Sequence, residues 1–573
     1  MSQFKYIILA SLLLSACAQT PKQALETDIS NHEETQEVTS SKLPNVELSS
    51  ELLYEFMLSE VAGQRGELGL AAEASASLAK KTRDPRLAMR AAHIAVQSGQ
   101  MDKALESLRI WEETDPDSLM AKRMLASVLL RTGKIGEAKD EMIKVLKADE
   151  AHAGQTIMQM FQMLANYPDK KAALEVMQEV ATLYPEHSES HWAVAQLARA
   201  IGQDATALNE VRQARKLSPQ WDMAVSLEAQ LLQKKAPLEG LEVLRYFLMG
   251  NPDSRDIRLQ YARTLLEQKQ FKQARDQFQR LSDENPDNPE MAYAVALISL
   301  QLNDLPRAEK EFEESLDKGR KDRDTVQYYL GQLGEAKKNE DEAIEHYRQV
   351  NGGEYYFASK IRVVYLLSKH GKHEEALELL RGLEPAGDQE SIQLVLVEAH
   401  VLRTANRYTE AYGFLKRNLD MQPDNPDLLY ETAMMAEKNG KPDEFEAMMR
   451  KLIDIDPDRA HAYNALGYSF LERNVRIPEA MALVKKAIEL SPDDPAIIDS
   501  MGWGHFLSGN LEDSLKLLRR AYSLNPDHEI AAHLGEVLWA SGNQKEAKKI
   551  WQESLKDNPE SRVLPAVMKR FMP

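Results

Sequence analysis

Apolar and polar residues follow one another along this chain with the spacing of amphipathic helices, and the predicted helices recur in pairs about every 34 residues. Nothing in the repeating part alternates with the period of two that a β-strand requires. This period predicts a tandem array of helix–turn–helix units, and an ordinary all-α protein would not hold one register over fifteen units. The residues that mark the end of each pair are Pro85, Pro116, Glu150, Pro185, Pro219, Pro252, Pro286, Arg320, Glu354, Asp388, Pro423, Pro457, Pro492, Pro526 and Pro559.

Small residues recur at two further positions of the units. An alanine about twelve residues before the marker lets the second helix approach the first, and a glycine at the turn suits the left-handed conformation that ends a helix. Leu466-Gly467, Met501-Gly502 and Leu534-Gly535 indicate close contacts in the middle of helices. The alanines are Ala104, Ala138, Ala173, Ala207, Ala274, Ala308, Ala343, Ala376, Ala411, Ala480 and Ala547, and the glycines are Gly99, Gly133, Gly202, Gly371, Gly440, Gly509 and Gly542.

At these positions the chain resembles the tetratricopeptide repeat (TPR) family. The family's order of Leu-Gly, an aromatic residue, Ala, a large apolar residue, Ala and Pro is matched between residues 466 and 492. Alanine is replaced at Gly240 and Phe445, and proline is absent at Glu354 and Asp388. The resemblance implies an all-α superhelical solenoid, which works by presenting a long curved surface.

Four parts are expected along the chain. The solenoid is predicted to form one elongated body of about 15 helix pairs, with the charged stretch 317–324 and the turn at Gly352-Gly353 as its flexible points. The four parts are a signal peptide over 1–16, a lipidated cysteine and tether over 17–48, the solenoid over 49–560 and a capping helix over 561–573.

The N-terminal segment has the order of a secretory signal. Lys5 precedes an apolar run from Tyr6 to Leu14, which is too short to span a bilayer, and small residues follow. The sequence Leu14-Ser15-Ala16-Cys17 resembles the lipobox of bacterial lipoproteins, in which the cysteine is lipid-modified and the peptide is cut before it. The alternative is an ordinary signal peptide with an incidental cysteine.

Cysteine usage favours the lipoprotein interpretation. Cys17 is the only cysteine in the sequence, so it has no partner for an intramolecular disulfide and a lipid anchor is its expected role. By resemblance to the lipoprotein sorting pattern, Ala18 implies the periplasmic face of the outer membrane of a Gram-negative bacterium. Residues 18–48 have almost no large apolar side chains, and we expect them to be a disordered tether.

The sequence predicts no enzyme, cofactor or metal site. It contains no Gly-rich phosphate loop, Gly-x-Ser-x-Gly turn or His-Glu-x-x-His motif. A formal net charge of −19 disfavours nucleic acid and favours a partner with a basic surface. His187 and His191 lie one helical turn apart but lack a third ligand, and His370 and His373 flank a turn, so all four are interpreted as surface residues.

The carboxyl-terminal repeats hold the candidate partner-binding residues. The TPR resemblance implies that the first helix of each unit lines a concave groove with its second, fifth, ninth and twelfth residues. Aromatic side chains beside Asn, Asp and Glu make a surface that can hold an extended peptide or a helix. In the last three units these residues include His461, Asn464, Tyr468, Leu471, Asp499, Trp503, Phe506, Glu529, Glu536 and Trp539.

A second interpretation is that Trp503, Phe506 and Trp539 pack between adjacent units as core residues. Alanine substitutions would then lower stability, whereas a groove role predicts weaker partner binding with stability unchanged. Trp551 stands at the large apolar position of a second helix and is predicted to be core. The amphipathic segment 561–573 is predicted to cap the array, because a terminal repeat must be covered to stay soluble.

Three carboxyl-terminal stretches, Tyr463 to Phe470, Asp499 to Trp503 and Ala532 to Trp539, are more distinctive than generic repeats. With the lipobox and the chain length, they resemble the large TPR lipoproteins that partner a periplasmic carboxyl-terminal processing protease. The resemblance implies a non-catalytic adaptor that binds this serine protease and delivers substrates, notably peptidoglycan hydrolases. Two partners held on one superhelix gain a high effective concentration.

Two other hypotheses for the function are compatible with the predicted lipid anchor, the repeats and the net negative charge of the chain. The first is a lipoprotein subunit of an exopolysaccharide export or outer-membrane assembly complex, which should co-purify with a β-barrel rather than a protease. The second is a protein that binds or hydrolyses peptidoglycan directly, which would need paired carboxylates in a carbohydrate cleft.

Overall fold

The computed structural model describes residues 43–572, and the chain divides into two compact units between Lys321 and Asp322. The sequence predicted one body, but the division falls inside the charged stretch 317–324 that it marked as a flexible point. The predicted signal peptide, Cys17 and the tether up to residue 42 lie outside the described residues.

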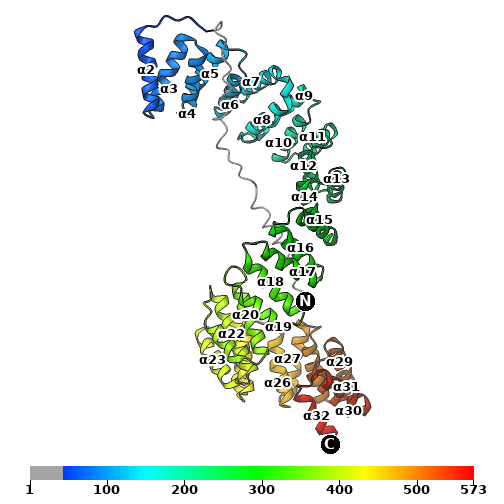
Figure 1. The fold of residues 1–573 in the computed structure, drawn as a ribbon. Helices are drawn as coiled ribbons and strands as arrows, with labels where there is room; N and C mark the ends of the chain where they lie inside the picture. Colours follow the sequence, from blue (N-terminus) through cyan, green and yellow to red (C-terminus); the bar gives the residue numbers. More distant parts are fainter. Residues whose placement is uncertain (1–42, 573) are drawn as a thin grey trace. The chain divides into compact units, whose positions relative to one another are not determined.

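Between residues 43 and 321, the described part of the first unit, one short 3-10 helix, η3 (Glu150–His152), lies between the α-helices. Figure 1 colours these helices from blue to green. The α-helices are α2 (Ser50–Gln64), α3 (Leu68–Thr82), α4 (Pro85–Gln97), α5 (Met101–Thr114), α6 (Leu119–Arg131), α7 (Ile135–Ala148), α8 (Ala153–Ala165), α9 (Lys170–Leu183), α10 (Ser188–Ala200), α11 (Asp204–Leu217), α12 (Asp222–Leu232), α13 (Pro237–Gly250), α14 (Arg255–Glu267), α15 (Phe271–Glu284), α16 (Pro289–Gln301) and α17 (Leu305–Asp317).

The second unit continues the same alternation of first and second helices and ends with one unpaired helix (Figure 1). Its helices are α18 (Arg323–Ala336), α19 (Glu340–Arg348), α20 (Tyr356–Lys369), α21 (His373–Arg381), α22 (Asp388–Thr404), α23 (Tyr408–Met421), α24 (Pro426–Lys438), α25 (Pro442–Ile455), α26 (Ala460–Glu472), α27 (Ile477–Leu490), α28 (Pro495–Leu507), α29 (Leu511–Leu524), α30 (His528–Ala540), α31 (Gln544–Asp557) and α32 (Val563–Phe571).

All regular structure in residues 43–572 is helical, which confirms the predicted all-α solenoid fold. Within each unit every α-helix packs against the next one, and the first helices of neighbouring pairs, such as α26 and α28, also contact one another. Among the described helices, none combines the length and apolar content that crossing a membrane requires.

The recurring alanines pack at the interface between the two helices of a pair. All eleven are completely buried, as expected for a small side chain between closely packed helices. At Gly240 an added Cβ atom would lie 3.2 Å from the carbonyl oxygen of Ala229, a tight contact with the backbone of the preceding helix. At Phe445 the interface instead accommodates a fully buried ring.

The turns between paired helices adopt the left-handed conformation expected from the glycines. The seven predicted glycines have φ values between +70° and +85°. Other units place a polar residue in the same backbone region, with φ between +54° and +61°; these residues are Lys269, Asn303, Lys338, Asn406 and Asn474. Asparagine tolerates this region better than most residues with a side chain.

The marker residues do not all have the predicted position. Pro116 follows the residue that caps the end of α5, as predicted. Pro85 and Asp388, however, are the first residues of α4 and α22, so they begin a helix pair instead of ending one. Proline suits a helix start because its fixed φ is already helical and its missing N–H is not needed there, and a carboxylate is favourable beside the positive end of the helix dipole.

The predicted mid-helix contacts are confirmed at all three glycines. A Cβ atom on Gly467 would lie 2.7 Å from Val484 Cγ2 and 3.0 Å from the carbonyl oxygen of Ala480. Comparable overlaps would occur between Gly502 and Leu518 and between Gly535 and Trp551.

Gly467→Ala is therefore expected to lower the free energy of unfolding by about 1–3 kcal/mol, because the added methyl group overpacks the contact between α26 and α27. The matched control is Gly413→Ala in α23, where the new Cβ would make an ordinary 3.7 Å contact with Arg417. This control should raise stability by about 0.5–1 kcal/mol, since alanine is the better helix former. Denaturant unfolding measures the free energy of unfolding of both variants. Equal changes for Gly467→Ala and Gly413→Ala would contradict the packing argument.

Candidate partner-binding site

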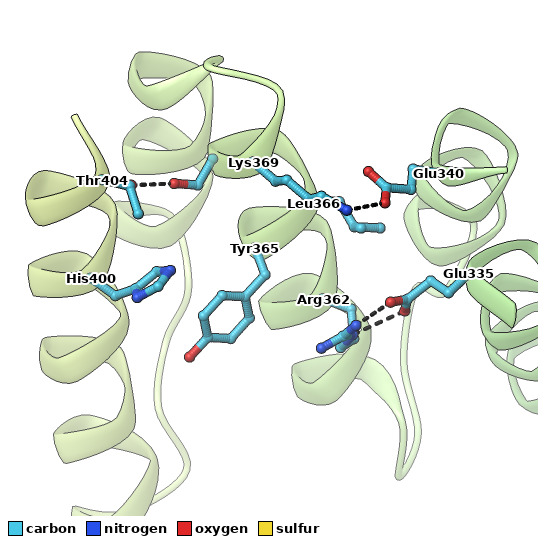
Figure 2. Close-up of a pocket in the computed structure, with 9 residues that line it drawn as sticks. Glu335, Glu340, Arg362, Tyr365, Leu366, Lys369, His400 and Thr404 are labelled. Carbon is cyan, nitrogen blue, oxygen red and sulfur yellow. Dashed lines mark hydrogen bonds and ion pairs between the residues drawn. The ribbon is translucent and has the colours of Figure 1, made fainter. Parts of the chain in front are cut away.

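The second unit contains a polar pocket that is lined by the first helices α18, α20 and α22 and by Glu340 at the start of the second helix α19. The pocket has a volume of ≈ 430 Å³. Figure 2 shows Arg362 and Tyr365 of α20 between Glu335 on one side and His400 on the other. Its lining residues are Glu335, Glu340, Arg362, Tyr365, Leu366, Ser368, Lys369, His400 and Thr404.

The charged groups of this pocket are paired with one another. Arg362 donates from Nε to Glu335 Oε1 at 2.9 Å, and Lys369 donates to Glu340 (Figure 2). The hydrogen bonds from Lys369 and His370 lower the pKa of Glu340, although burial opposes them. The pocket is therefore lined by internally neutralised ion pairs.

One wall of the pocket joins α20 to α22. Tyr365 and His400 contact edge to face with ring centroids 5.1 Å apart, and Ser368 Oγ lies 2.6 Å from Thr404 Oγ1. Burial, together with the neighbouring Arg403, lowers the pKa of His400, so this imidazole is neutral at physiological pH.

A second candidate site lies on the first helices of the last three pairs, α26, α28 and α30. Asp499 and Glu536 are almost completely buried, with 6% and 7% of their surface exposed, whereas His461 is exposed. The aromatic and amide side chains of the same helices are half-buried. We call this set the acid–aromatic surface; it comprises Asn464, Tyr468, Asp499, Trp503, Phe506, Glu529, His533, Glu536 and Trp539.

The three aromatic residues that could line the groove or pack in the core are both packed and partly exposed. Trp503, Phe506 and Trp539 pack against the hydrophobic core of the last repeats, and each keeps part of its surface exposed. Trp503 and Phe506 contact one another with ring centroids 5.1 Å apart. A groove role for these residues stays a prediction, whereas Trp551 is fully buried in the core.

His533 joins the residues of the acid–aromatic surface to one another. Its Nδ1 atom lies 2.8 Å from Asp499 Oδ2, and its Nε2 atom lies 3.4 Å from the hydroxyl oxygen of Tyr468. Its ring stacks on Trp503 with a centroid separation of 4.4 Å and an interplanar angle of 22°. One side chain thus links α30 to both α26 and α28.

The terminal helix α32 covers the other end of this surface. Arg570 donates a hydrogen bond to Glu536 Oε2, and Phe571 packs against both Trp539 and Trp551 with ring centroids 5.8 Å away. Burial raises the pKa of Glu536, although Arg570 and His533 oppose this. The contact of α32 with α30 and α31 is what a capping helix would make.

The His533–Asp499 pair makes stability depend on pH. Burial alone would lower the pKa of His533, but the charge of Asp499 and its hydrogen bond outweigh burial and raise it. The folded-state pKa lies above the unfolded one, so the pair's stabilisation is fully present below the ordinary value of 6.5. It is lost as the pH rises through the folded-state pKa.

We expect an NMR titration of the His533 ring to show this raised pKa. Asp499→Asn should lower the pKa of His533, because it removes the carboxylate while burial remains. Asp493→Asn, which changes an exposed carboxylate of the same repeat, is the control and should leave it almost unchanged. A His533 pKa that does not respond to Asp499→Asn would contradict the assigned pair.

Sequence reasoning missed three features of these sites, namely the pocket, His533 and Arg570. The signal for two of them is the repeat period, because Asp499 and His533, like Glu536 and Arg570, are 34 residues apart. Residues one period apart lie on neighbouring units and can face one another. The pocket had no such signal, since its lining comes from several positions of three units.

The histidines considered as metal ligands have other partners. His191 lies 2.6 Å from Glu210 Oε2 and 3.0 Å from the carbonyl oxygen of Pro185, while His187 precedes α10. His370 contacts Glu340, and His373 Nδ1 lies 3.4 Å from Ser368 Oγ. Within residues 43–572, no three His, Cys, Asp or Glu side chains are arranged to hold a metal ion.

Two family models, both described as tetratricopeptide repeat, match the chain. One matches residues 231–298 and 402–467, and the other matches residues 300–353 and 446–495. Both units therefore contain matched repeats, since residues 231–298 lie in the first unit and residues 402–467 and 446–495 lie in the second.

The chain is also similar to individual proteins of known structure. TTC0263, a thermophilic TPR protein of Thermus thermophilus, is 23% identical, and the match covers 30% of this chain and 95% of that one with a TM-score of 0.29. The C-terminal part of a TPR repeat-containing protein of Cytophaga hutchinsonii is 16% identical over 42% of this chain and 99% of that one, with a TM-score of 0.34.

A curated relative matches most of the chain. The TPR repeat-containing protein PA4667 of Pseudomonas aeruginosa is 32% identical over 492 residues, which are 85% of this chain and 82% of the relative. The chain therefore belongs to the family of TPR repeat-containing proteins that includes this Pseudomonas protein.

Proposed function

We propose that this protein is a non-catalytic outer-membrane lipoprotein that binds a periplasmic carboxyl-terminal processing protease and presents peptidoglycan hydrolases to it for degradation. The general part of this role follows from the repeats, because TPR arrays are scaffolds for protein–protein interaction. The observation that carries it is the arrangement of the second unit, where the acid–aromatic surface and most of the lining of a polar pocket lie on first helices of the repeats.

The specific part of the proposal is supported by sequence patterns. The stretches Tyr463 to Phe470, Asp499 to Trp503 and Ala532 to Trp539 resemble the protease-adaptor lipoproteins. The lipobox ending at Cys17 supports a lipid anchor, and Ala18 supports the outer membrane as its location.

The proposed mechanism is the co-localisation of two partners. A protease and a hydrolase bound to one array meet at an effective concentration of the order of millimolar, without any new contact between them. The net charge of −19 would accelerate the encounter with a basic partner. Catalysis stays with the protease, and the scaffold sets which substrate it meets.

Affinity purification tests this proposal. Residues 18–573, immobilised through an N-terminal tag, are mixed with an envelope extract, and the retained proteins are identified by mass spectrometry. Recovery of a processing protease together with a cell-wall hydrolase is expected. Recovery of β-barrel export or assembly components without a protease would contradict the proposal and favour the alternative complex.

A further inference from the structure

The acid–aromatic surface already holds one basic side chain, and that side chain comes from the protein itself. Arg570 of α32 donates to the buried carboxylate of Glu536, while the next residue, Phe571, packs on Trp539. A basic residue followed by an aromatic one therefore occupies the α30 end of the surface. This contact is an internal example of the chemistry that the surface accepts.

Asp499, an acidic residue of the neighbouring first helix α28, is paired with His533 through only one of its two carboxylate oxygens. Asp499 uses Oδ2 for His533, but its Oδ1 atom is buried without a hydrogen-bond partner. The Oδ1 atom of Asn464, on the neighbouring helix α26, is likewise buried and unpaired. Buried acceptors without a donor cost free energy, so a donor group that reached them would be bound favourably.

The surroundings of these two acceptors favour a cation over a neutral donor. Trp503 and Tyr468 are half-buried aromatic rings beside them, and aromatic faces attract cations. Burial and the nearby carboxylates of Glu472, Asp499 and Glu529 raise the pKa of Tyr468. His533 pairs with Asp499, and it occupies only one of the two carboxylate oxygens.

We infer that the α26–α28 part of the acid–aromatic surface, formed by Asn464, Tyr468, Asp499 and Trp503, binds a lysine or arginine side chain that stands beside an aromatic residue in a partner protein. The basic group donates to Asp499 and Asn464 and lies against Trp503, as Arg570 and Phe571 do at Glu536 and Trp539. The inference rests on the proposed function only in that the repeats bind a protein partner.

A capped peptide, acetyl-Gly-Lys-Arg-Phe-Gly-amide, is the probe. The tryptophan side chains of residues 18–573 are labelled with ¹⁵N, and the indole signal of Trp503 is identified with Trp503→Phe. The peptide should shift this signal saturably. An analogue with norleucine and citrulline in place of Lys and Arg should bind at least about tenfold more weakly, because it lacks the charge.

Variants locate the binding group. Asp499→Asn should weaken binding about tenfold or more, whereas the control Asp493→Asn, an exposed carboxylate paired with Arg520 in the same repeat, should change it less than about twofold. Glu529→Gln, an exposed position at the edge of the surface, should weaken binding about two- to threefold. If Asp499→Asn does not fold, the Glu529→Gln variant still tests the inference.

Several results would overturn the inference. These are equal binding of the neutral peptide, equal losses for Asp493→Asn and Glu529→Gln, or a shift of the Trp539 signal instead of Trp503. Binding of Gly-Phe-Gly-amide, with its free amine, in place of the Lys-Arg peptide would assign the site to a chain terminus and would also overturn it. Peptide binding and protease capture are separate measurements, so either proposal can fail alone.

Discussion

Trp551→Ala is expected to lower the free energy of unfolding of the last repeats by about 3–5 kcal/mol, since truncating a buried tryptophan leaves a large cavity. Trp551 is fully buried, and its ring packs on Trp539 and Phe571 at 5.9 and 5.8 Å. A Cβ atom on Gly535 would overlap its indole, so the ring fits against bare backbone. No smaller side chain fills this space.

The effect should be local, because each unit of a repeat array contacts mainly its neighbours. Hydrogen exchange should accelerate in α30 to α32 and remain unchanged in residues 50–317. Trp539→Ala is the matched control. It should lower the free energy of unfolding by less than Trp551→Ala does, because the Trp539 ring is half-exposed. A larger effect for Trp539→Ala than for Trp551→Ala would contradict the assignment of Trp551 to the core.

Cys17→Ser is expected to move the protein from the membrane fraction to the soluble fraction and to abolish incorporation of labelled palmitate. The serine hydroxyl cannot form the thioether that anchors a lipoprotein, and several acyl chains are needed for stable membrane binding. Cys17 is the only cysteine, so the substitution removes no disulfide.

Fractionation of cells that produce each form measures this result. Ser15→Thr, a change beside the cysteine that keeps the thiol, is the control and should remain in the membrane fraction. Membrane retention of Cys17→Ser with palmitate labelling intact would contradict the lipoprotein assignment.

The repeat architecture could be predicted because it depends on local rules. Complete burial of alanines such as Ala480 and positive φ at glycines such as Gly440 follow from the sequence period alone. Pro85 misled the register, because proline is favourable both just after one helix and at the start of the next. A residue type with two favourable positions cannot define a boundary by itself.

The candidate site could be predicted only in part. The groove positions found Asp499 and Trp503, but they gave no indication that His533 would connect them, since His533 stands one residue outside the expected groove positions. The period places Arg570 one unit after Glu536, but it does not establish that the two side chains meet, because α32 has no partner helix to set its orientation. Such contacts depend on how successive helices rotate, which the period does not specify.

The most direct test of the adaptor role is the rate at which the captured protease degrades the captured hydrolase, with and without residues 18–573. The account predicts faster degradation that passes through a maximum as the scaffold concentration rises, because excess scaffold places the two partners on separate copies. A degradation rate that is unchanged at every scaffold concentration would contradict it.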